Sequence, residues 1–276
     1  MAESDWTWDP TLYAGSARFY ADGRVAYPVS LATALTDELG LDGTGRLLDV
    51  GCGPGSLTLL LADRFAAAVG IDADPDMIEE ARERARRAGV GNIDWATMRG
   101  EELPGALGTF EVVSFAQSFH WMQRELVARA VRSMLVPEGA CVHVHATTHQ
   151  GVDDDADLPH PRPPRAEIND LVRRYLGPVR RAGRGVFNDA GGGEDAIYRA
   201  AGFADRRRIE VGGGPVERST DEVVASIFSL SSSTPHLFGD RVLEFEHELR
   251  GLLQVASPGG VFSEQMPAVA VDVWRP

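Results

Sequence analysis

Short runs of apolar residues alternate along the first half of the chain with segments in which apolar residues recur every three or four positions. The short runs have the length of buried strands, and the periodic segments have the pattern of amphipathic helices. The predicted strands cover residues 46–50, 67–71, 93–97, 110–116 and 140–147. The predicted helices cover residues 29–39, 56–64, 75–88 and about 123–135. Crossover connections of this kind are right-handed, so the order predicts a doubly wound, mostly parallel α/β sheet with its ligand at the carboxyl ends of the strands.

The second half of the chain is less regular. The elements expected there are a helix over 166–176, a return of the core pattern at 197–202, strands near 208–211 and over 267–274, and a helical region over 220–255 that is interrupted around 231–235. Residues 151–193 separate the two halves and are acidic, proline-rich and then glycine-rich. Connections of that length usually serve a function, and we interpret this one as a partial lid over a ligand pocket.

The first predicted strand runs directly into three glycines at alternate positions, Gly51, Gly53 and Gly55. Glycine adopts backbone conformations that other residues avoid and lets a ligand approach main-chain amides at the start of a helix. A dinucleotide fingerprint would have the spacing G-x-G-x-x-G, whereas here it is G-x-G-x-G with Asp49 on the strand before it. Asp72 ends the next predicted strand, where an acidic side chain can bind both hydroxyls of a ribose. The pattern predicts a nucleotide-binding turn.

Four ordered segments, LLDVGCGPG, GIDADPDMIEEAR, RGEELP and FEVVSFAQSFHWM, resemble the motif set of class I S-adenosylmethionine-dependent methyltransferases. FYADGRVAYP, YRAAGF and SIFSLSSSTP are similar to segments of the small-molecule branch that includes the trans-aconitate type. The resemblance implies a Rossmann-like methyltransferase fold with a seven-stranded sheet and an antiparallel edge hairpin. It also implies S-adenosyl-L-methionine as cofactor and S-adenosyl-L-homocysteine as product.

The resemblance also implies where the cofactor binds. Asp49 and Gly51 would face the methionyl ammonium, Asp72 would hold the ribose, and main-chain groups at Gly100 and Glu101 would hold the adenine. Members of the family often have an acidic residue where this chain has Arg99, which can only donate hydrogen bonds. The cofactor-binding residues expected in this way are Tyr20, Arg24, Asp49, Gly51, Cys52, Gly53, Gly55, Asp72, Ala73, Met77, Gly100, Glu101 and Gln117.

The segment after the fourth predicted strand carries the candidate catalytic residue. His120 is expected to act as a general base, because a histidine with an ordinary pKa near 6.5 can accept a hydroxyl proton near neutral pH. The alternative is that His120 caps the following helix or positions the cofactor. Trp121 is expected in the substrate pocket, with the core as its alternative location.

His143 and His145 lie two positions apart on a predicted strand, so they share a face, and His149 follows in the adjacent loop. A histidine pair of this kind can bind a metal, but the sequence offers no third ligand at a convincing spacing, and methyl transfer from a sulfonium needs no metal. No metal is therefore expected, and His145 is assigned to the substrate pocket.

The charge and the cysteines restrict the partners and the compartment. A net charge of −14 disfavours nucleic acid, because binding phosphates needs a basic surface, so a small molecule is the expected partner. Cys52 and Cys141 are far apart in sequence, which favours a reducing cytoplasm, and no signal or membrane-spanning pattern is present. All 27 basic residues are Arg, a bias typical of a G·C-rich, bacterial genome. A monomer or homodimer is expected.

The sequence therefore predicts one methyltransferase domain over residues 1–276, with residues 1–28 covering the cofactor and 151–193 forming a lid and acceptor insertion. Its expected function is transfer of a methyl group to a small molecule, at oxygen, in bacterial secondary metabolism. Three alternatives remain open: a relative that binds the cofactor but catalyses another reaction, an NAD-dependent oxidoreductase, and a non-enzymatic binding or regulatory module. The glycine spacing disfavours the oxidoreductase.

Overall fold

The computed structural model describes residues 9–154, 157–179, 181–182, 185–186 and 193–276. We call residues 1–28 the leader. Trp6 and Trp8 of the leader lie outside the described residues, as do residues 155–156, 180, 183–184 and 187–192 of the 151–193 segment. Among the described helices, none has both the length and the apolar character that crossing a membrane requires.

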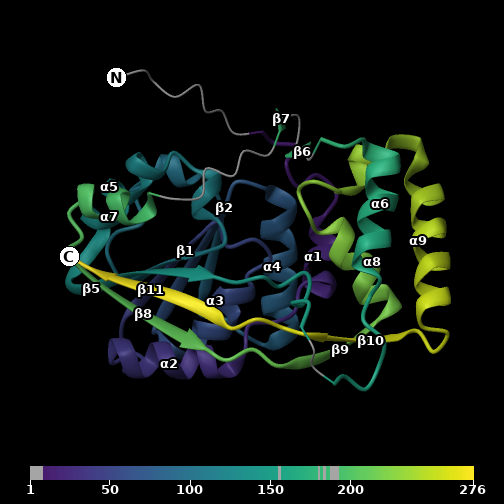
Figure 1. Ribbon diagram of the computed structural model, residues 1–276. Coiled ribbons are helices and arrows are strands. Elements are labelled where there is room, and N and C mark those ends of the chain that lie inside the picture. Colours follow the sequence, from purple (N-terminus) through teal and green to yellow (C-terminus); the bar gives the residue numbers. More distant parts are fainter. Residues whose placement is uncertain (1–8, 155–156, 180, 183–184, 187–192) are drawn as a thin grey trace.

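Seven strands form the central sheet, in the order β3-β2-β1-β4-β5-β11-β8 (Figure 1). The strands are β1 (Arg46–Val50), β2 (Ala67–Asp72), β3 (Ile93–Thr97), β4 (Phe110–Ala116), β5 (Leu135–His145), β8 (Asp205–Val211) and β11 (Val269–Arg275). β1 to β5 pair in parallel, whereas β11 runs antiparallel to both β5 and β8. The predicted fold class, a doubly wound, mostly parallel sheet with an antiparallel pair of strands at one edge, is confirmed.

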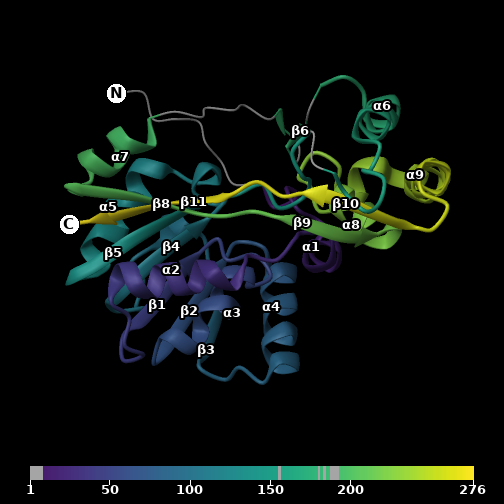
Figure 2. The same ribbon diagram turned by 60° about the horizontal axis from the view of Figure 1, so that its bottom comes forward.

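Helices cover both faces of this sheet (Figure 2). They are α2 (Val29–Leu39), α3 (Ser56–Leu61), α4 (Pro75–Ala88), α5 (Arg124–Met134) and α7 (Glu194–Ala200). Leu48 and Val50 of β1 point into the apolar cluster beneath α5 and α7, whereas Leu47 points into the cluster beneath α2 and α3. Both faces of β1 are buried, which explains why its sequence is a continuous apolar run rather than an alternating one.

Local signals fixed several boundaries correctly. α4 begins at Pro75 and ends at Ala88 as predicted, and the side chain of Asp74 caps it by accepting a hydrogen bond from the Asp76 amide at 2.8 Å. Gly89 ends the helix in the left-handed conformation, with φ at +68°. An Asn or Asp side chain at the first position and a glycine at the last are the usual boundary signals of a helix.

The predicted start of β5 was wrong. The strand begins at Leu135 rather than at residue 140, and residues 137–139, predicted as a turn, lie within it. The pairing of β4 with β5 shifts register between Phe110 and Val112, so an irregularity in the ladder takes the place of a turn.

A second group of helices lies at one end of the sheet, which we call the helical cap (Figure 1). It consists of α1 (Ala17–Gly23), α6 (Arg165–Leu176), α8 (Thr220–Phe228), the short helix η4 (Pro235–Arg241) and α9 (Val242–Ala256). These helices have their own apolar cluster, which includes Phe228, Phe238 and Phe245. The predicted interruption of the long helical region is confirmed, because α8 and α9 are separate helices.

A two-stranded antiparallel ribbon, β9 (Pro215–Ser219) and β10 (Val261–Gln265), connects the cap to β8 and β11. The sequence did not predict these strands. Most of their residues are polar, so they lack the apolar runs that mark the strands of the central sheet.

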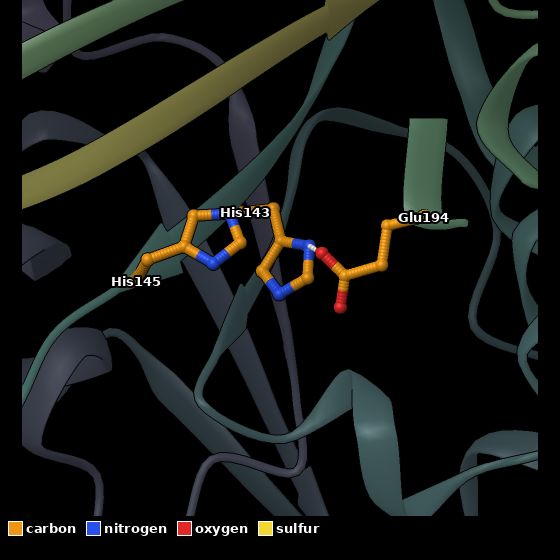
Figure 3. Close-up of side chains that lie close together, drawn as sticks. All are labelled: His143, His145 and Glu194. Carbon is orange, nitrogen blue, oxygen red and sulfur yellow. Dashed lines mark ion pairs between the residues drawn. The ribbon is translucent and has the colours of Figure 1, made fainter. Parts of the chain in front are cut away.

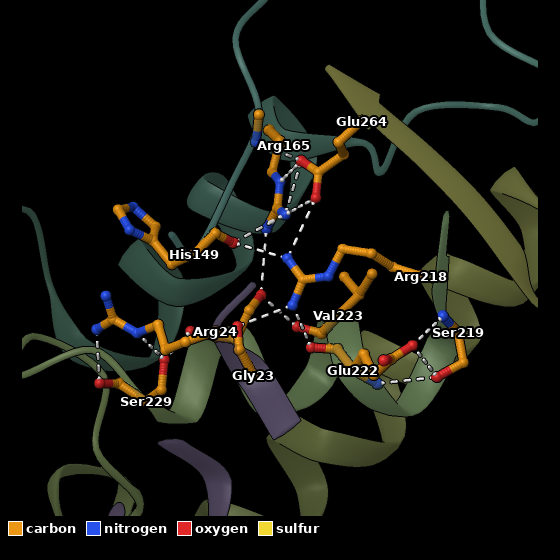
Figure 4. Close-up of polar contacts among 12 residues, drawn as sticks. Gly23, Arg24, His149, Arg165, Arg218, Ser219, Glu222, Val223, Ser229 and Glu264 are labelled. Carbon is orange, nitrogen blue, oxygen red and sulfur yellow. Dashed lines mark hydrogen bonds and ion pairs between the residues drawn. The ribbon is translucent and has the colours of Figure 1, made fainter. Parts of the chain in front are cut away.

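A buried ion-pair network fastens the cap to the sheet and the leader (Figure 4). Glu264 on β10 is 3% exposed and lies 2.8 Å from the Arg165 guanidinium and 3.2 Å from that of Arg218. Arg218, also 3% exposed, donates to the carbonyl oxygens of Gly23 at 2.8 Å and His149 at 2.9 Å. Four separate segments of the chain therefore depend on one carboxylate.

We predict that Glu264→Gln lowers the free energy of unfolding by about 3 kcal/mol or more, because it leaves two guanidinium groups without their buried counter-charge. Urea unfolding followed by circular dichroism measures the change. Glu244→Gln is the control, because its partner Arg241 and Glu244 itself are both more than half exposed, at 54% and 56%. Equal effects of the two substitutions would show that the network does not hold the cap in place.

Candidate functional site

A pocket opens where β1, β2 and β4 end, and we call it the main pocket. The turn after β1 and the end of β2 form one side, and Tyr13, Tyr20 and Tyr27 of the leader form another. Its empty volume is about 820 Å³, open solvent at the mouth included. The sheet order predicts a ligand at this edge.

The glycine turn after β1 has left-handed backbone at all three glycines, with φ at +68°, +54° and +75° for Gly51, Gly53 and Gly55. A Cβ on Gly51 would lie 2.5 Å from the Cβ of Ser118, and one on Gly55 would lie 2.5 Å from the ring of Trp95. A Cβ on Gly53 would meet nothing within 4 Å. Gly51 and Gly55 are thus required by packing, whereas Gly53 faces the open space of the pocket.

Asp72 lies beside this turn at the end of β2. Its Oδ2 accepts a hydrogen bond from the Gly53 amide at 2.8 Å, and its Oδ1 accepts one from the Asp74 amide at 2.9 Å. Burial, opposed by these two hydrogen bonds, raises the pKa of Asp72 to about 6. The side chain is therefore ionised at neutral pH, and each oxygen keeps a lone pair that can accept from a ligand hydroxyl.

Asp49 occupies a different place from the one expected. Its carboxylate is fully buried and accepts hydrogen bonds from Thr58 Oγ1 at 2.6 Å and Ser114 Oγ at 2.8 Å, and burial raises its pKa. It therefore braces β1 against α3 and β4 rather than lining the pocket. Residues two apart on a strand share a face, so its position relative to Leu47, which packs beneath α3, could have indicated this orientation.

The leader supplies part of the pocket wall. Tyr20 lines the pocket, but Arg24 lies behind it, with its guanidinium 4.6 Å from the Tyr20 ring and bonded to Ser229 Oγ at 2.8 Å. The sequence did not single out Tyr13 or Tyr27 as pocket residues. The only signal for them was the concentration of aromatic residues in a polar segment.

The loop after β3 also forms part of the pocket wall. Gly100 and Glu101 line it together with Arg99, whose backbone amide donates to Glu102 Oε2 at 2.7 Å. The side chain of Glu101 accepts from the Gln123 amide at 2.8 Å, so it is fixed by the segment that precedes α5. Met77, at the start of α4, adds apolar surface.

A second, more open cavity lies on the other side of Gln117, and we call it the histidine cavity. Gln117 lines both cavities, and its side-chain amide donates to the Tyr27 hydroxyl at 3.0 Å. His120 lines the histidine cavity with His143 and His145, whereas Trp121 lines the main pocket. The proposed base and the aromatic residue beside it therefore face different spaces.

His143, His145 and His149 do not form one group. His143 is buried among aromatic rings, which lowers its pKa to about 3 and keeps the ring neutral, and it stacks on His145 at 4.2 Å between ring centres. His149 lies apart, where its carbonyl oxygen accepts from Arg165 and Arg218.

The structure thus sorts the expected site residues into three groups. Those that line the main pocket are Tyr20, Gly51, Cys52, Gly53, Asp72, Ala73, Met77, Gly100, Glu101, Gln117 and Trp121. His120 and His145 line the histidine cavity. Arg24, Asp49 and Gly55 line neither of these two cavities.

Comparisons with known proteins agree on one family. A family model described as a methyltransferase domain matches residues 47–139. A 2-heptyl-1-hydroxyquinolin-4(1H)-one methyltransferase of Mycobacteroides abscessus is 30% identical over 163 residues, which cover 56% of this chain and 71% of that protein. A trans-aconitate 2-methyltransferase of Streptomyces coelicolor is 41% identical over 93 residues, which cover 33% of this chain and only 29% of that protein.

A similar fold occurs in the crystal structure of the YcgJ protein of Bacillus subtilis. The two chains superpose with a TM-score of 0.52 over 88% of this chain and 97% of that one. At 17% identity this likeness concerns the fold alone.

We predict that Gly51→Ala destabilises the protein more than Gly53→Ala. Both substitutions place a Cβ on left-handed backbone, at a cost of about 1 to 2 kcal/mol. Gly51→Ala adds about 1 to 3 kcal/mol, because its Cβ overlaps Ser118. Urea unfolding measures both values. Gly89→Ala, also left-handed and with nothing within 4 Å, is the control for the backbone term alone, and a Gly51→Ala value equal to it would contradict the prediction.

Proposed function

Because this chain belongs to the class I S-adenosylmethionine-dependent methyltransferases, we propose that it transfers the methyl group of S-adenosylmethionine to a small-molecule acceptor and releases S-adenosylhomocysteine. The contact between the glycine turn and Asp72 carries the proposal. It places an open main-chain surface at Gly53 next to a carboxylate with free lone pairs.

The residues of the main pocket fit this donor. Asp72 would accept hydrogen bonds from the ribose hydroxyls, and Gly53, which has open space above it, would let the ligand approach the turn. Ala73 and Met77 would offer apolar surface to the adenine, and main-chain groups at Gly100 and Glu101 would form hydrogen bonds with its edge. Tyr20, which also lines the pocket, would cover the methionyl part.

The donor's sulfonium makes its methyl carbon electrophilic, so the protein has to align an acceptor and remove one proton. The histidine cavity is the proposed acceptor side, because it adjoins the main pocket at Gln117, which lines both. His120, exposed on its wall, is the proposed general base, and His145 and Trp121 are proposed to contact the acceptor.

An oxygen atom is the proposed methyl acceptor. A hydroxyl group loses its proton as it is methylated, so an acceptor of this kind needs a base such as His120. The two relatives named above are both named for small oxygen-containing molecules. We propose that the reaction belongs to bacterial secondary metabolism.

The chain is proposed to act as one domain over residues 1–276, with the leader over the cofactor and 151–193 over the acceptor. The described part of that segment includes α6, which belongs to the helical cap. The two cysteines are free and buried, in keeping with the proposed cytoplasmic location.

We predict that Asp72→Ala weakens binding of S-adenosylhomocysteine by about 10- to 100-fold, because it removes hydrogen bonds to a charged acceptor. Isothermal titration calorimetry measures the affinity. In the unsubstituted protein the affinity should also fall as the pH drops through about 6, because Asp72 then gains a proton and loses acceptor capacity.

Adenosine is the better probe for the pH series, because neither its ribose nor its base titrates in this range. Asp72→Asn should bind adenosine weakly and without this pH dependence. Asp76→Ala, an exposed carboxylate on α4, is the control and should behave as the unsubstituted protein does. If Asp72→Ala bound S-adenosylhomocysteine and adenosine with unchanged affinity, Asp72 would not hold the ribose.

We predict that His120→Ala lowers methyl transfer by about 100-fold or more while leaving donor affinity unchanged, because the base acts on the acceptor only. Release of S-adenosylhomocysteine with an acceptor found by screening small hydroxylated compounds measures the rate. His247→Ala, an exposed histidine on α9, is the control. Full turnover by the His120 variant would assign that histidine a role other than proton acceptor.

A further inference from the structure

The histidine cavity contains a set of metal-ligand side chains drawn from two parts of the chain (Figure 3). His143 and His145 lie on the same face of β5, and Glu194 is the first residue of α7, which packs on that face. One ligand atom from each residue can be chosen so that all three atoms lie within 4.8 Å of one another. The sequence shows the histidine pair but not the third ligand, because the fold brings Glu194 to it from a distant position.

A hydrogen bond to Nε2 of His145 leaves its other ring nitrogen, Nδ1, as the candidate metal ligand. His145 Nε2 lies 3.1 Å from Asp272 Oδ2 on β11, and Arg206 holds the other oxygen of that carboxylate at 3.0 Å. A carboxylate paired with an arginine can only accept a hydrogen bond, so Nε2 carries the proton and Nδ1 of the neutral ring carries the lone pair. A buried carboxylate that fixes a histidine in this way is a recurrent feature of metal sites.

The types of ligand and their spacing also favour a metal ion. Two imidazoles and one carboxylate form a common zinc ligand set, and Glu194 Oε2 already lies 3.4 Å from His143 Nδ1. Two ligands of a tetrahedral zinc ion lie roughly 3.4 Å apart, so side-chain movements on the order of 1 Å would complete the coordination.

We propose that His143, His145 and Glu194 bind a divalent transition-metal ion such as Zn²⁺. Two nitrogen ligands and one carboxylate leave at least one coordination position open, as in catalytic rather than structural zinc sites. The open position faces the histidine cavity, which these three residues line.

The location of the ion gives it a role next to methyl transfer. Gln117 separates the histidine cavity from the main pocket, so an acceptor oxygen bound to the ion would lie on the acceptor side of the donor site. Coordination lowers the pKa of a bound hydroxyl and so assists the removal of its proton. This role rests on the proposed function, whereas metal binding itself does not.

Titration of the full, chelator-dialysed chain with Zn²⁺ in a calorimeter, without donor or acceptor, tests the site. We expect one equivalent to bind, and Glu194→Gln and His145→Ala each to weaken binding by about tenfold or more. His247→Ala is the matched control, because this exposed histidine lies on α9 at the opposite end of the molecule (Figure 1), and it should leave the high-affinity phase unchanged. Mg²⁺ should bind at least tenfold more weakly, since it prefers oxygen ligands.

Two outcomes would overturn the proposal: no saturable binding of Zn²⁺ by the folded chain, or the same affinity in Glu194→Gln, His145→Ala and the unsubstituted protein. Both cysteines are buried, and burial raises the pKa of Cys52 and raises that of Cys141 to about 12, which disfavours the thiolate form that binds zinc. Binding of S-adenosylhomocysteine to Glu194→Gln is measured in parallel. Loss of zinc binding by Glu194→Gln with retained S-adenosylhomocysteine binding supports the metal site. Because the two ligands are measured separately, failure of the metal site can be distinguished from failure of the proposed function.

Discussion

The hydrogen bond from the Gly53 amide to the Asp72 carboxylate is the contact on which the main pocket depends. The parallel register of β1 and β2 sets Val50 beside Ile71, so the turn after one strand and the last residue of the other meet at the same level of the sheet. A side chain at Gly53 would project into the space next to this contact. The amides of Gly51, Cys52, Gly53 and Gly55 are thus already bonded within the protein, and a carboxylate lies beside them, an arrangement poorly suited to a pyrophosphate.

The parts of this architecture that the sequence predicted are those specified by neighbouring residues. An apolar run that ends in glycines defined β1 and its turn, and Asp74 with Gly89 defined both ends of α4. Asp72 could be assigned to the pocket because it ends an apolar strand one crossover after the glycine turn. Each of these signals acts within a few residues, and the right-handed crossover rule then fixes the topology.

The remaining parts depend on contacts between distant residues, and no local pattern encodes those. The ion pair of Arg218 with Glu264 fixes the helical cap, and the bond from Gln117 to Tyr27 brings the leader onto the pocket. Glu194 joins His143 only because α7 packs against the face of β5 on which that histidine lies. Asp49 was misplaced for another reason: the family resemblance suggested a ligand contact, whereas burial on the side of α3 turns its carboxylate to Thr58.

Gln117 lies between the main pocket and the histidine cavity and lines both. It is the only non-glycine residue among those described with a positive φ, at +59°, although a glutamine in that conformation is strained. Strain of this kind persists where the surrounding structure enforces it, and here its backbone amide bonds to Val144 while its side chain bonds to Tyr27. The conformation places one side chain in the walls of both cavities at the end of β4. The strained backbone thus accompanies a polar side chain that bonds to the leader and lies between the two cavities.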